Sequence, residues 1–274
     1  MKLAAVIGWP IHHSRSPKLH THWLKRYGIQ GSYVALPIRP EDLAACLPIL
    51  PKMGFTGCNL TIPHKEIVLP LLDEMDDAAR AIGAVNTVTF QDGRILGTNT
   101  DVYGFYEYLR RSVPDFRADA GPIAVLGAGG ASRAVLYGLA EAGAREIRVI
   151  NRSKARADAL IQHFQRPGLT LHAVDDAGAQ EALQGTTLVV NATSLGMTGQ
   201  PGHTLSLDGL APGATVYDLV YSPLDTDLLI QARARGYRTV DGLGMLLYQA
   251  KPAFARFFGT DPQVDDDLRA AVLA

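Results

Sequence analysis

Two short stretches near the middle of this 274-residue chain have the residue types of a phosphate site, the first small residues and the second cations. The first follows an apolar run over 123–126 and reads Gly127-Ala128-Gly129-Gly130-Ala131, which predicts a buried strand that turns through glycines into a helix. Gly127 permits the tight turn, and Gly129 leaves room for a pyrophosphate before the N–H groups of the helix. Ser132 stands at the third glycine of the usual pattern and is small enough for close packing of helix on strand.

The second stretch lies where the next predicted strand ends, at Asn151, Arg152 and Ser153, with Arg156 one turn later. A site for NAD usually has a carboxylate about 20 residues after the glycines, to hold the ribose hydroxyl. This chain has cations and a hydroxyl instead, which suit the 2′-phosphate of NADP. The sequence therefore predicts an NADP site, and the alternative is a solvated basic helix start.

Ser14 and Ser16 follow the first predicted strand and precede a predicted helix. Ser16 and Pro17 fit the N-cap and first helical positions, because proline costs nothing where the N–H is unpaired. Capping alone would explain Ser16. The same hydroxyls beside free helix N–H groups would also bind a carboxylate.

Lys65 and His64 follow a predicted strand over 55–60, at the edge where α/β sheets place their ligands. Either side chain could move a proton, and neighbouring helical residues point in different directions. The residues alone leave this choice open. Asp101 lies at another predicted strand end, where it could cap the following helix or accept hydrogen bonds from a substrate hydroxyl or Lys65.

The composition restricts the class of protein further. The chain is 47% hydrophobic with a net charge of −1, so no overall field favours nucleic acid or a membrane surface. Cys46 and Cys58 form neither a disulfide framework nor a metal motif. We expect a cytoplasmic enzyme without a metal, signal peptide or membrane span.

Strand-like and helix-like segments alternate in two successive blocks, which predicts two α/β domains separated by a cleft. We expect a substrate domain over 1–103 plus 240–274 and a Rossmann-like NADP domain over 104–239. Strands are expected at 3–7, 33–36, 55–60, 84–90, 95–98, 123–126, 147–150, 169–173, 188–191, 215–218 and 238–240. Helices are expected at 17–27, 41–48, 76–81, 102–111, 131–142, 154–164, 244–258 and 261–274.

The order of these motifs resembles the shikimate dehydrogenase family over about residues 1–258. The segments that carry the resemblance are Gly8–His20, Asn59–Lys65, Gly83–Thr87, Asn99–Asp101, Gly127–Ala131, Asn151–Arg152, Asn191–Gly196, Tyr217–Tyr221 and Asp241–Gln249. The resemblance implies reversible, NADPH-dependent reduction of 3-dehydroshikimate to shikimate, a step toward chorismate and the aromatic amino acids. It also implies a monomer or homodimer that acts on a small molecule.

The resemblance assigns roles residue by residue and favours Lys65 over His64. Lys65 and Asp101 would be the catalytic pair. Substrate would be held by Ser14, Ser16, Thr61, Asn86, Asp101, Tyr221 and Gln249. NADP would be held by Gly127, Ala128, Gly129, Gly130, Ala131, Asn151, Arg152, Ser153, Arg156, Thr193, Ser194, Val220, Gly244 and Met245.

Two rival functions remain. One is a quinate/shikimate dehydrogenase that prefers NAD. The basic residues from Arg152 to Arg156 disfavour this alternative. The other is a catalytically silent binding paralogue, which should have lost Lys65 or Asp101. Both are present.

Overall fold

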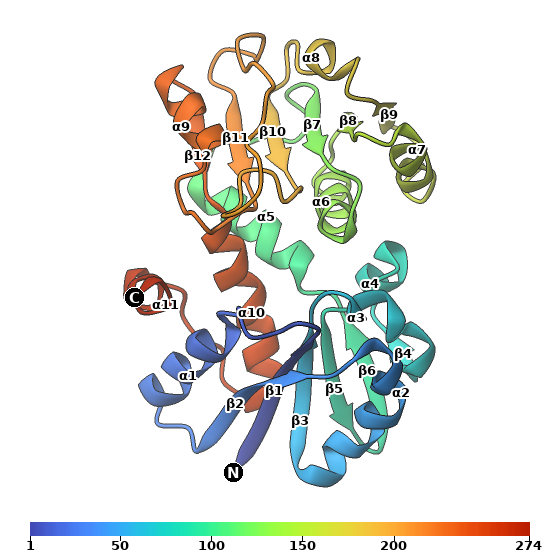
Figure 1. Ribbon diagram of the computed structural model, residues 1–274, viewed down its shortest axis with the longest axis vertical. Coiled ribbons are helices and arrows are strands. Elements are labelled where there is room, and N and C mark those ends of the chain that lie inside the picture. Colours follow the sequence, from blue (N-terminus) through green and yellow to red (C-terminus); the bar gives the residue numbers. More distant parts are fainter. The chain divides into compact units, whose positions relative to one another are not determined.

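The computed structural model describes residues 1–274 and forms two compact units (Figure 1). Unit 1 comprises Met1–Gly104 and Leu247–Ala274, and unit 2 comprises Phe105–Leu246. Helices α5 (Asp101–Ser112) and α10 (Gly242–Phe258) contribute residues to both units. Each unit has one six-stranded sheet and its own helices, so the predicted α/β class is confirmed. No helix has the length and apolarity needed to cross a bilayer.

The sheet of unit 1 is mixed. Its order is β2 (Gly31–Pro37), β1 (Lys2–Gly8), β3 (Phe55–Leu60), β5 (Thr87–Gln91), β6 (Arg94–Thr98) and β4 (Glu74–Met75). Strand β1 runs parallel to β2 and β3, whereas β5 is antiparallel to both of its neighbours. Ile7 pairs with Leu60, so the loops that follow β1 and β3 leave the sheet side by side.

Alternate residues of these strands face two different layers. Ala5, Ile7 and Cys58 share one apolar core with the segment after β2. On the other face, α1 (Ser16–Arg26), α10 and one tyrosine of β2 contribute a cluster of aromatic rings and one buried histidine. Its members are His20, Trp23, Tyr33, Phe254 and Phe257.

The helix predicted over 41–48 is not continuous. The chain forms a 3-10 turn at Pro40–Asp42, a short α2 (Leu43–Cys46) and a second 3-10 segment at Leu47–Met53. Pro48 and Pro51 lack the N–H that each further α-helical turn would need, so the tighter helix takes over.

The C-terminal segment is bound to α1. Helix α11 (Asp266–Leu273) begins after Asp265, whose side chain accepts the N–H of Leu268. The Trp23 Nε1 donates to the Gln263 carbonyl at 2.9 Å, and Arg26 pairs with Asp265 at 2.6 Å. This segment therefore stabilises unit 1.

The sheet of unit 2 is entirely parallel. Its order is β12 (Arg238–Val240), β11 (Thr215–Asp218), β10 (Leu188–Asn191), β7 (Ile123–Leu126), β8 (Glu146–Ile150) and β9 (Thr170–Val174). This is the doubly wound order of dinucleotide-binding folds, in which the order reverses between β7 and β10. Every residue of β7, β10 and β11 is buried, as expected for strands covered on both faces.

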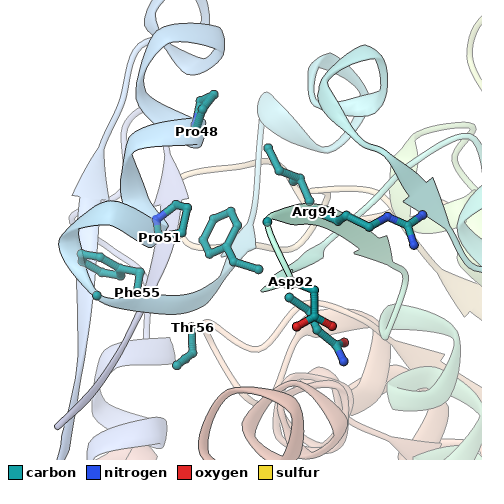
Figure 2. Close-up of a pocket in the computed structure, with 11 residues that line it drawn as sticks. Pro48, Pro51, Phe55, Thr56, Asp92 and Arg94 are labelled. Atoms are coloured by element: carbon teal, nitrogen blue, oxygen red, sulfur yellow. The ribbon is translucent and has the colours of Figure 1, made fainter.

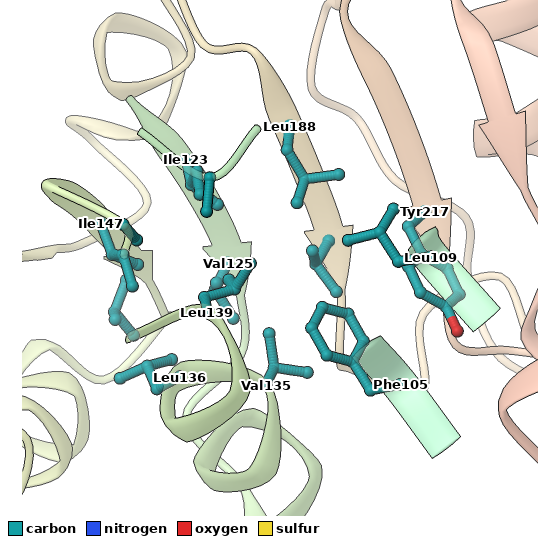
Figure 3. Close-up of a cluster of buried hydrophobic side chains, with 14 of the residues drawn as sticks. Phe105, Leu109, Ile123, Val125, Val135, Leu136, Leu139, Ile147, Leu188 and Tyr217 are labelled. Carbon is teal, nitrogen blue, oxygen red and sulfur yellow. The ribbon is translucent and has the colours of Figure 1, made fainter. Parts of the chain in front are cut away.

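Helices cover both faces of this sheet. Helices α6 (Gly130–Glu141), α7 (Lys154–Gln162) and the second half of α5 share one core, and α8 (Ala179–Ala182) and α9 (Asp227–Ala234) share the other. Figure 3 shows Val135 and Leu139 of α6 against Val125 of β7, with Phe105 and Tyr217 nearby. The Phe105 and Tyr217 rings stack with centroids 5.3 Å apart. This packing fixes the start of α6 at the end of β7.

Candidate active site

The centre of the candidate site in unit 1 is an ion pair between Lys65 and Asp101. Lys65 lies on the short α3 (His64–Ile67) after β3, and Asp101 is the first residue of α5. The Lys65 Nζ lies 2.5 Å from the Asp101 Oδ2, with the two side chains 27% and 11% exposed. The Asp101 N–H donates to the Asn99 Oδ1 at 3.0 Å. Asp101 therefore directs its carboxylate to Lys65, and Asn99 satisfies a backbone donor at the helix start.

Asn86 holds the other oxygen of that carboxylate. Its Nδ2 donates to the Asp101 Oδ1 at 2.9 Å and, over 3.4 Å, to the Gln249 Oε1. Its Oδ1 accepts the Thr100 N–H at 2.8 Å. Asn86 is buried, so these contacts fix one orientation of its amide. Unit 1 thus brings together Lys65, Asp101, Asn86 and Gln249.

His64 is unsuited to proton transfer with a substrate. The side chain is fully buried, and its Nε2 lies 2.8 Å from the Ile38 carbonyl oxygen, to which it must donate. Burial lowers the pKa of His64. Of the two residues between which the sequence left the choice open, Lys65 pairs with Asp101, whereas His64 is held by the Ile38 carbonyl.

Ser14 and Ser16 lie at the start of α1, but not as predicted. Ser16 is the first helical residue and Arg15 holds the N-cap position, so the predicted cap at Ser16 was wrong by one residue. The reason is that the Ser14 Oγ accepts the Ser16 N–H, at 3.3 Å, which lets the helix begin earlier. Ser16 is buried and Ser14 half-buried.

Thr61 lies against the end of β1, which connects it to the serine loop. A side-chain carbon at Gly8 would lie only 2.6 Å from the Thr61 Cγ2, so glycine is required there for close approach. The Trp9 N–H donates to the Ile62 carbonyl at 3.2 Å. The loops after β1 and β3 therefore form one polar edge of the sheet.

A separate pocket of unit 1 has no part in this site. It has a volume of about 390 Å³ and lies among Pro48, Pro51, Phe55 and the β5–β6 turn with Asp92 and Arg94 (Figure 2). Phe55 is the first residue of β3, whereas Thr61 and Lys65 follow its last residue. The pocket is therefore at the opposite end of the strand.

The glycine turn of unit 2 has the geometry of a phosphate-binding turn. Gly127 has φ +105°, and a Cβ there would lie 2.9 Å from the Thr193 Cγ2. A Cβ at Gly129 or Gly130 would meet nothing within 4 Å, so open space lies before the first turn of α6. The Ser132 Oγ accepts the Gly129 N–H at 3.3 Å. The residues fit a pyrophosphate at the positive end of the helix.

The basic residues after β8 lie on the surface. Arg152 and Arg156 are exposed and make no ion pair, whereas Lys154 pairs with Asp158 at 2.9 Å. The Asn151 Nδ2 donates to the Ser153 carbonyl at 2.9 Å and shapes the turn. Two cations and the exposed Ser153 hydroxyl are thus available to a ribose phosphate.

The remaining predicted cofactor residues belong to unit 2. Thr193 and exposed Ser194 follow β10, and buried Val220 follows β11. A Cβ at Gly244 would lie 2.1 Å from the Tyr108 ring, so packing alone requires that glycine. Met245 packs against the unit 2 core. Tyr221 is on unit 2, unlike the other predicted substrate residues.

The sequence analysis assigned no role to Asn59 of unit 1 or Asp218 of unit 2, both of which are buried polar residues near the predicted sites. The Tyr33 hydroxyl donates to the Asn59 Oδ1 at 2.7 Å, and Asn59 donates to the Asn86 carbonyl at 3.1 Å. In unit 2, Asp218 accepts hydrogen bonds from Asn191 and Val220. A polar residue at the end of a buried parallel strand was the available signal for Asp218.

The fold and the two sets of residues define a two-unit dehydrogenase of the nicotinamide-dependent class. Two family models match the chain, described as the shikimate dehydrogenase substrate binding domain over residues 6–88 and shikimate / quinate 5-dehydrogenase over residues 110–197. The chain belongs to the shikimate dehydrogenase family, which confirms the resemblance seen in the sequence.

Individual relatives are similar over nearly their whole length. Shikimate dehydrogenase (NADP(+)) of Paracoccus denitrificans is 55% identical over 99% of this chain and 96% of the relative. The structure of shikimate 5-dehydrogenase from Thermus thermophilus with NADP(H) and shikimate has a TM-score of 0.87 at 38% identity, covering 100% and 99% of the two chains. Quinate dehydrogenase from Corynebacterium glutamicum with NAD has a TM-score of 0.91 at 34% identity, covering 100% and 99%.

Proposed function

We propose that this protein is an NADP-dependent shikimate dehydrogenase that interconverts 3-dehydroshikimate and shikimate. The observation that carries the proposal is the Lys65–Asp101 pair, held by Asn86, in a chain whose second unit has a glycine turn and unpaired arginines. Full-length relatives with more than half of their residues identical bear the same name.

Unit 1 binds the substrate. Ser14 and Ser16 hold its carboxylate with hydroxyl groups, at the start of α1. Thr61, Asn86, Asp101 and Gln249 hold the ring hydroxyls, and Tyr221 of unit 2 adds a further contact. We assign these roles from the family motifs, and the contacts among Asn86, Asp101 and Gln249 support them.

Unit 2 binds NADP. The turn from Gly127 to Ala131 holds the pyrophosphate, while Asn151, Arg152, Ser153 and Arg156 hold the adenosine ribose and its phosphate. Thr193, Ser194, Val220, Gly244 and Met245 border the rest of the cofactor. When bound, the reduced cofactor supplies the hydride.

Lys65 provides the acid for the reaction. Negative charge develops on the carbonyl oxygen as the ketone is reduced, and an ammonium beside it stabilises that charge and donates the proton. In the reverse direction, Lys65 takes the proton from the alcohol. Asp101 orients the Lys65 Nζ and the reacting hydroxyl, and Asn86 keeps the Asp101 carboxylate in place.

We further propose that the enzyme acts in the cytoplasm, in the pathway that leads to aromatic amino acids. The free thiols of Cys46 and Cys58 are consistent with a reducing compartment.

The function is tested by offering shikimate and quinate to the purified protein, each with NADP⁺ and with NAD⁺. We expect reduced cofactor to form fastest with shikimate and NADP⁺. Faster turnover of quinate with NAD⁺ would favour the NAD-preferring rival. Absence of turnover in all four mixtures, with binding retained, would indicate the silent paralogue.

A further inference from the structure

Unit 2 contains a buried carboxylate that the reaction does not use. Asp218 ends β11, is fully buried and pairs in register with Asn191 at the end of β10. Its Oδ1 accepts the Asn191 Nδ2–H at 2.8 Å and the Val220 N–H at 3.0 Å, and its Oδ2 accepts the Thr226 hydroxyl at 2.6 Å. Burial raises the pKa of Asp218, and the hydrogen bonds from Thr226, Val220 and Asn191 oppose that increase.

A buried carboxylate is a costly way to stabilise a fold. Removing a charge from water has a large penalty, and apolar residues of similar volume often give equal or greater stability. All hydrogen-bond partners of Asp218 lie on segments that leave the carboxyl edge of the sheet. The contribution of Asp218 therefore lies in the geometry that it imposes on those segments.

Asp218 is one of three groups that fix the orientation of the Asn191 amide. The others are the Leu195 carbonyl, which accepts the same Nδ2 at 3.1 Å, and the Thr193 N–H. An asparagine amide can exchange its oxygen and nitrogen by rotation, but an ionised carboxylate only accepts hydrogen bonds. The Asn191 Nδ2 must therefore face Asp218, and its Oδ1 faces Thr193. That oxygen accepts the Thr193 N–H at 3.0 Å and hydroxyl at 2.7 Å. The Thr193 hydroxyl in turn accepts the Leu195 N–H at 3.0 Å.

Asp218 also fixes the loop after β11. Its carboxylate accepts the Val220 N–H. The carbonyl groups of the same loop face Gly242, where an added Cβ would lie 2.2 Å from the Leu219 oxygen and 2.6 Å from the Val220 oxygen. The Thr198 N–H donates to the Ser222 carbonyl at 2.8 Å and joins the loops after β10 and β11. The two loops therefore share one anchor.

We propose that Asp218 is a positioning residue for the nicotinamide half of the cofactor, acting through Asn191 and Val220. The inference rests on the proposed function, which assigns Thr193 and Ser194 to the pyrophosphate and ribose and Val220 to the nicotinamide, all beyond the adenosine end of the cofactor. Because Asp218 is fully buried, it acts on the cofactor through these neighbours and not by direct contact.

The test compares two ligands bound by wild type and Asp218→Ala. NADP⁺ spans the whole site, whereas adenosine 2′,5′-bisphosphate offers only the adenosine end to Arg152. We expect Asp218→Ala to raise the Kd of NADP⁺ about tenfold, since hydrogen bonds to a charged group are lost, and to leave that of the bisphosphate unchanged. Asp218→Asn keeps the side-chain volume and some of the hydrogen bonds, so we expect it to raise the Kd of NADP⁺ only about threefold. This variant decides the question if Asp218→Ala does not fold.

Thr226→Ala is the matched control. It removes one bond to Asp218 and the N-cap of α9, yet leaves Val220 and Asn191 in place. We expect a lower Tm with an unchanged Kd of NADP⁺. The proposal is overturned if the Asp218 variants bind NADP⁺ like wild type, if they weaken both ligands equally, or if Thr226→Ala weakens NADP⁺ as much. A wild-type protein that does not bind NADP⁺ would instead refute the proposed function.

Discussion

The substrate site of unit 1 and the cofactor site of unit 2 are built differently. In unit 1, buried or half-buried side chains hold one another, from Asn86 through Asp101 to Lys65. In unit 2, a backbone turn at Gly127 and exposed arginines face solvent. Side chains fixed in one orientation can specify where charge develops, whereas backbone N–H groups and mobile cations mainly supply affinity. Changes at Lys65, Asp101 and Asn86 of unit 1 should therefore alter rate, and changes in the cofactor site of unit 2 should alter cofactor affinity.

The largest effect is expected for Lys65→Ala. We predict that kcat falls by about 10²–10⁴-fold with little change in KM, since the interaction of Lys65 strengthens as charge develops. Steady-state kinetics with shikimate measure both constants. Lys52→Ala, which changes an exposed lysine of the same unit, should behave as wild type. A change in KM alone would remove Lys65 from the chemistry.

A smaller effect, on affinity, is expected for Arg152→Ala. We predict about a 10–30-fold rise in the KM of NADPH and almost none in that of NADH, because a charge-assisted bond to the 2′-phosphate is lost. Lys154→Ala is the comparison, because Lys154 is already paired with Asp158 and should matter less. An equal rise in KM for both cofactors would mean that Arg152 does not bind the 2′-phosphate.

Ser14→Ala tests the anion site of unit 1. We predict about a tenfold rise in the KM of shikimate, as expected for one hydroxyl lost from a carboxylate, with kcat nearly unchanged. Ser112→Ala, at an exposed position of α5, is the control. If the KM of shikimate stays at its wild-type value, Ser14 does not hold the carboxylate.

The smallest effect concerns stability and the buried His20. Its ring stacks on Tyr33 at 3.9 Å, neither ring nitrogen has a partner, and burial lowers its pKa to about 3. Between about pH 6.5 and 3 the folded state then binds fewer protons than the unfolded state. The free energy of unfolding therefore decreases as the pH is lowered through that window. We predict a loss of about 1 kcal/mol between pH 7.5 and 5.5 from this residue.

Urea unfolding of His20→Phe at both pH values checks that prediction. Phenylalanine keeps the ring but cannot be protonated, so the pH dependence should become flatter by that amount. His12→Gln, at an exposed position, should not flatten it. An equally steep dependence in His20→Phe would show that other groups cause the effect.

Much of the fold could be predicted from the sequence because buried strands are apolar runs. Strands β3, β7, β10, β11 and β12 have the bounds expected from their residues. The short β4, α3 and α8 have too few residues for a periodic pattern, and no helix was expected at α9. Pro48 and Pro51 turned one predicted helix into 3-10 segments.

The candidate site was harder to derive from residues alone. Whether His64 or Lys65 faces the site depends on the Ile38 carbonyl, which lies 26 positions earlier in the chain. The cap at Ser16 was misplaced because the Ser14 hydroxyl takes its N–H. In both cases a tertiary or loop contact fixes a side chain whose type, but not orientation, the sequence reveals.

The difference between the two sites is tested most directly by measuring two quantities for Lys65→Ala and Arg152→Ala. These are the Kd of NADPH, by fluorescence titration, and kcat with shikimate at saturating NADP⁺. We predict that Lys65→Ala binds NADPH like wild type but has almost no kcat, and that Arg152→Ala binds NADPH weakly but keeps its kcat. Weak binding of NADPH by Lys65→Ala, together with a full kcat at saturation, would contradict the assignment of rate to unit 1.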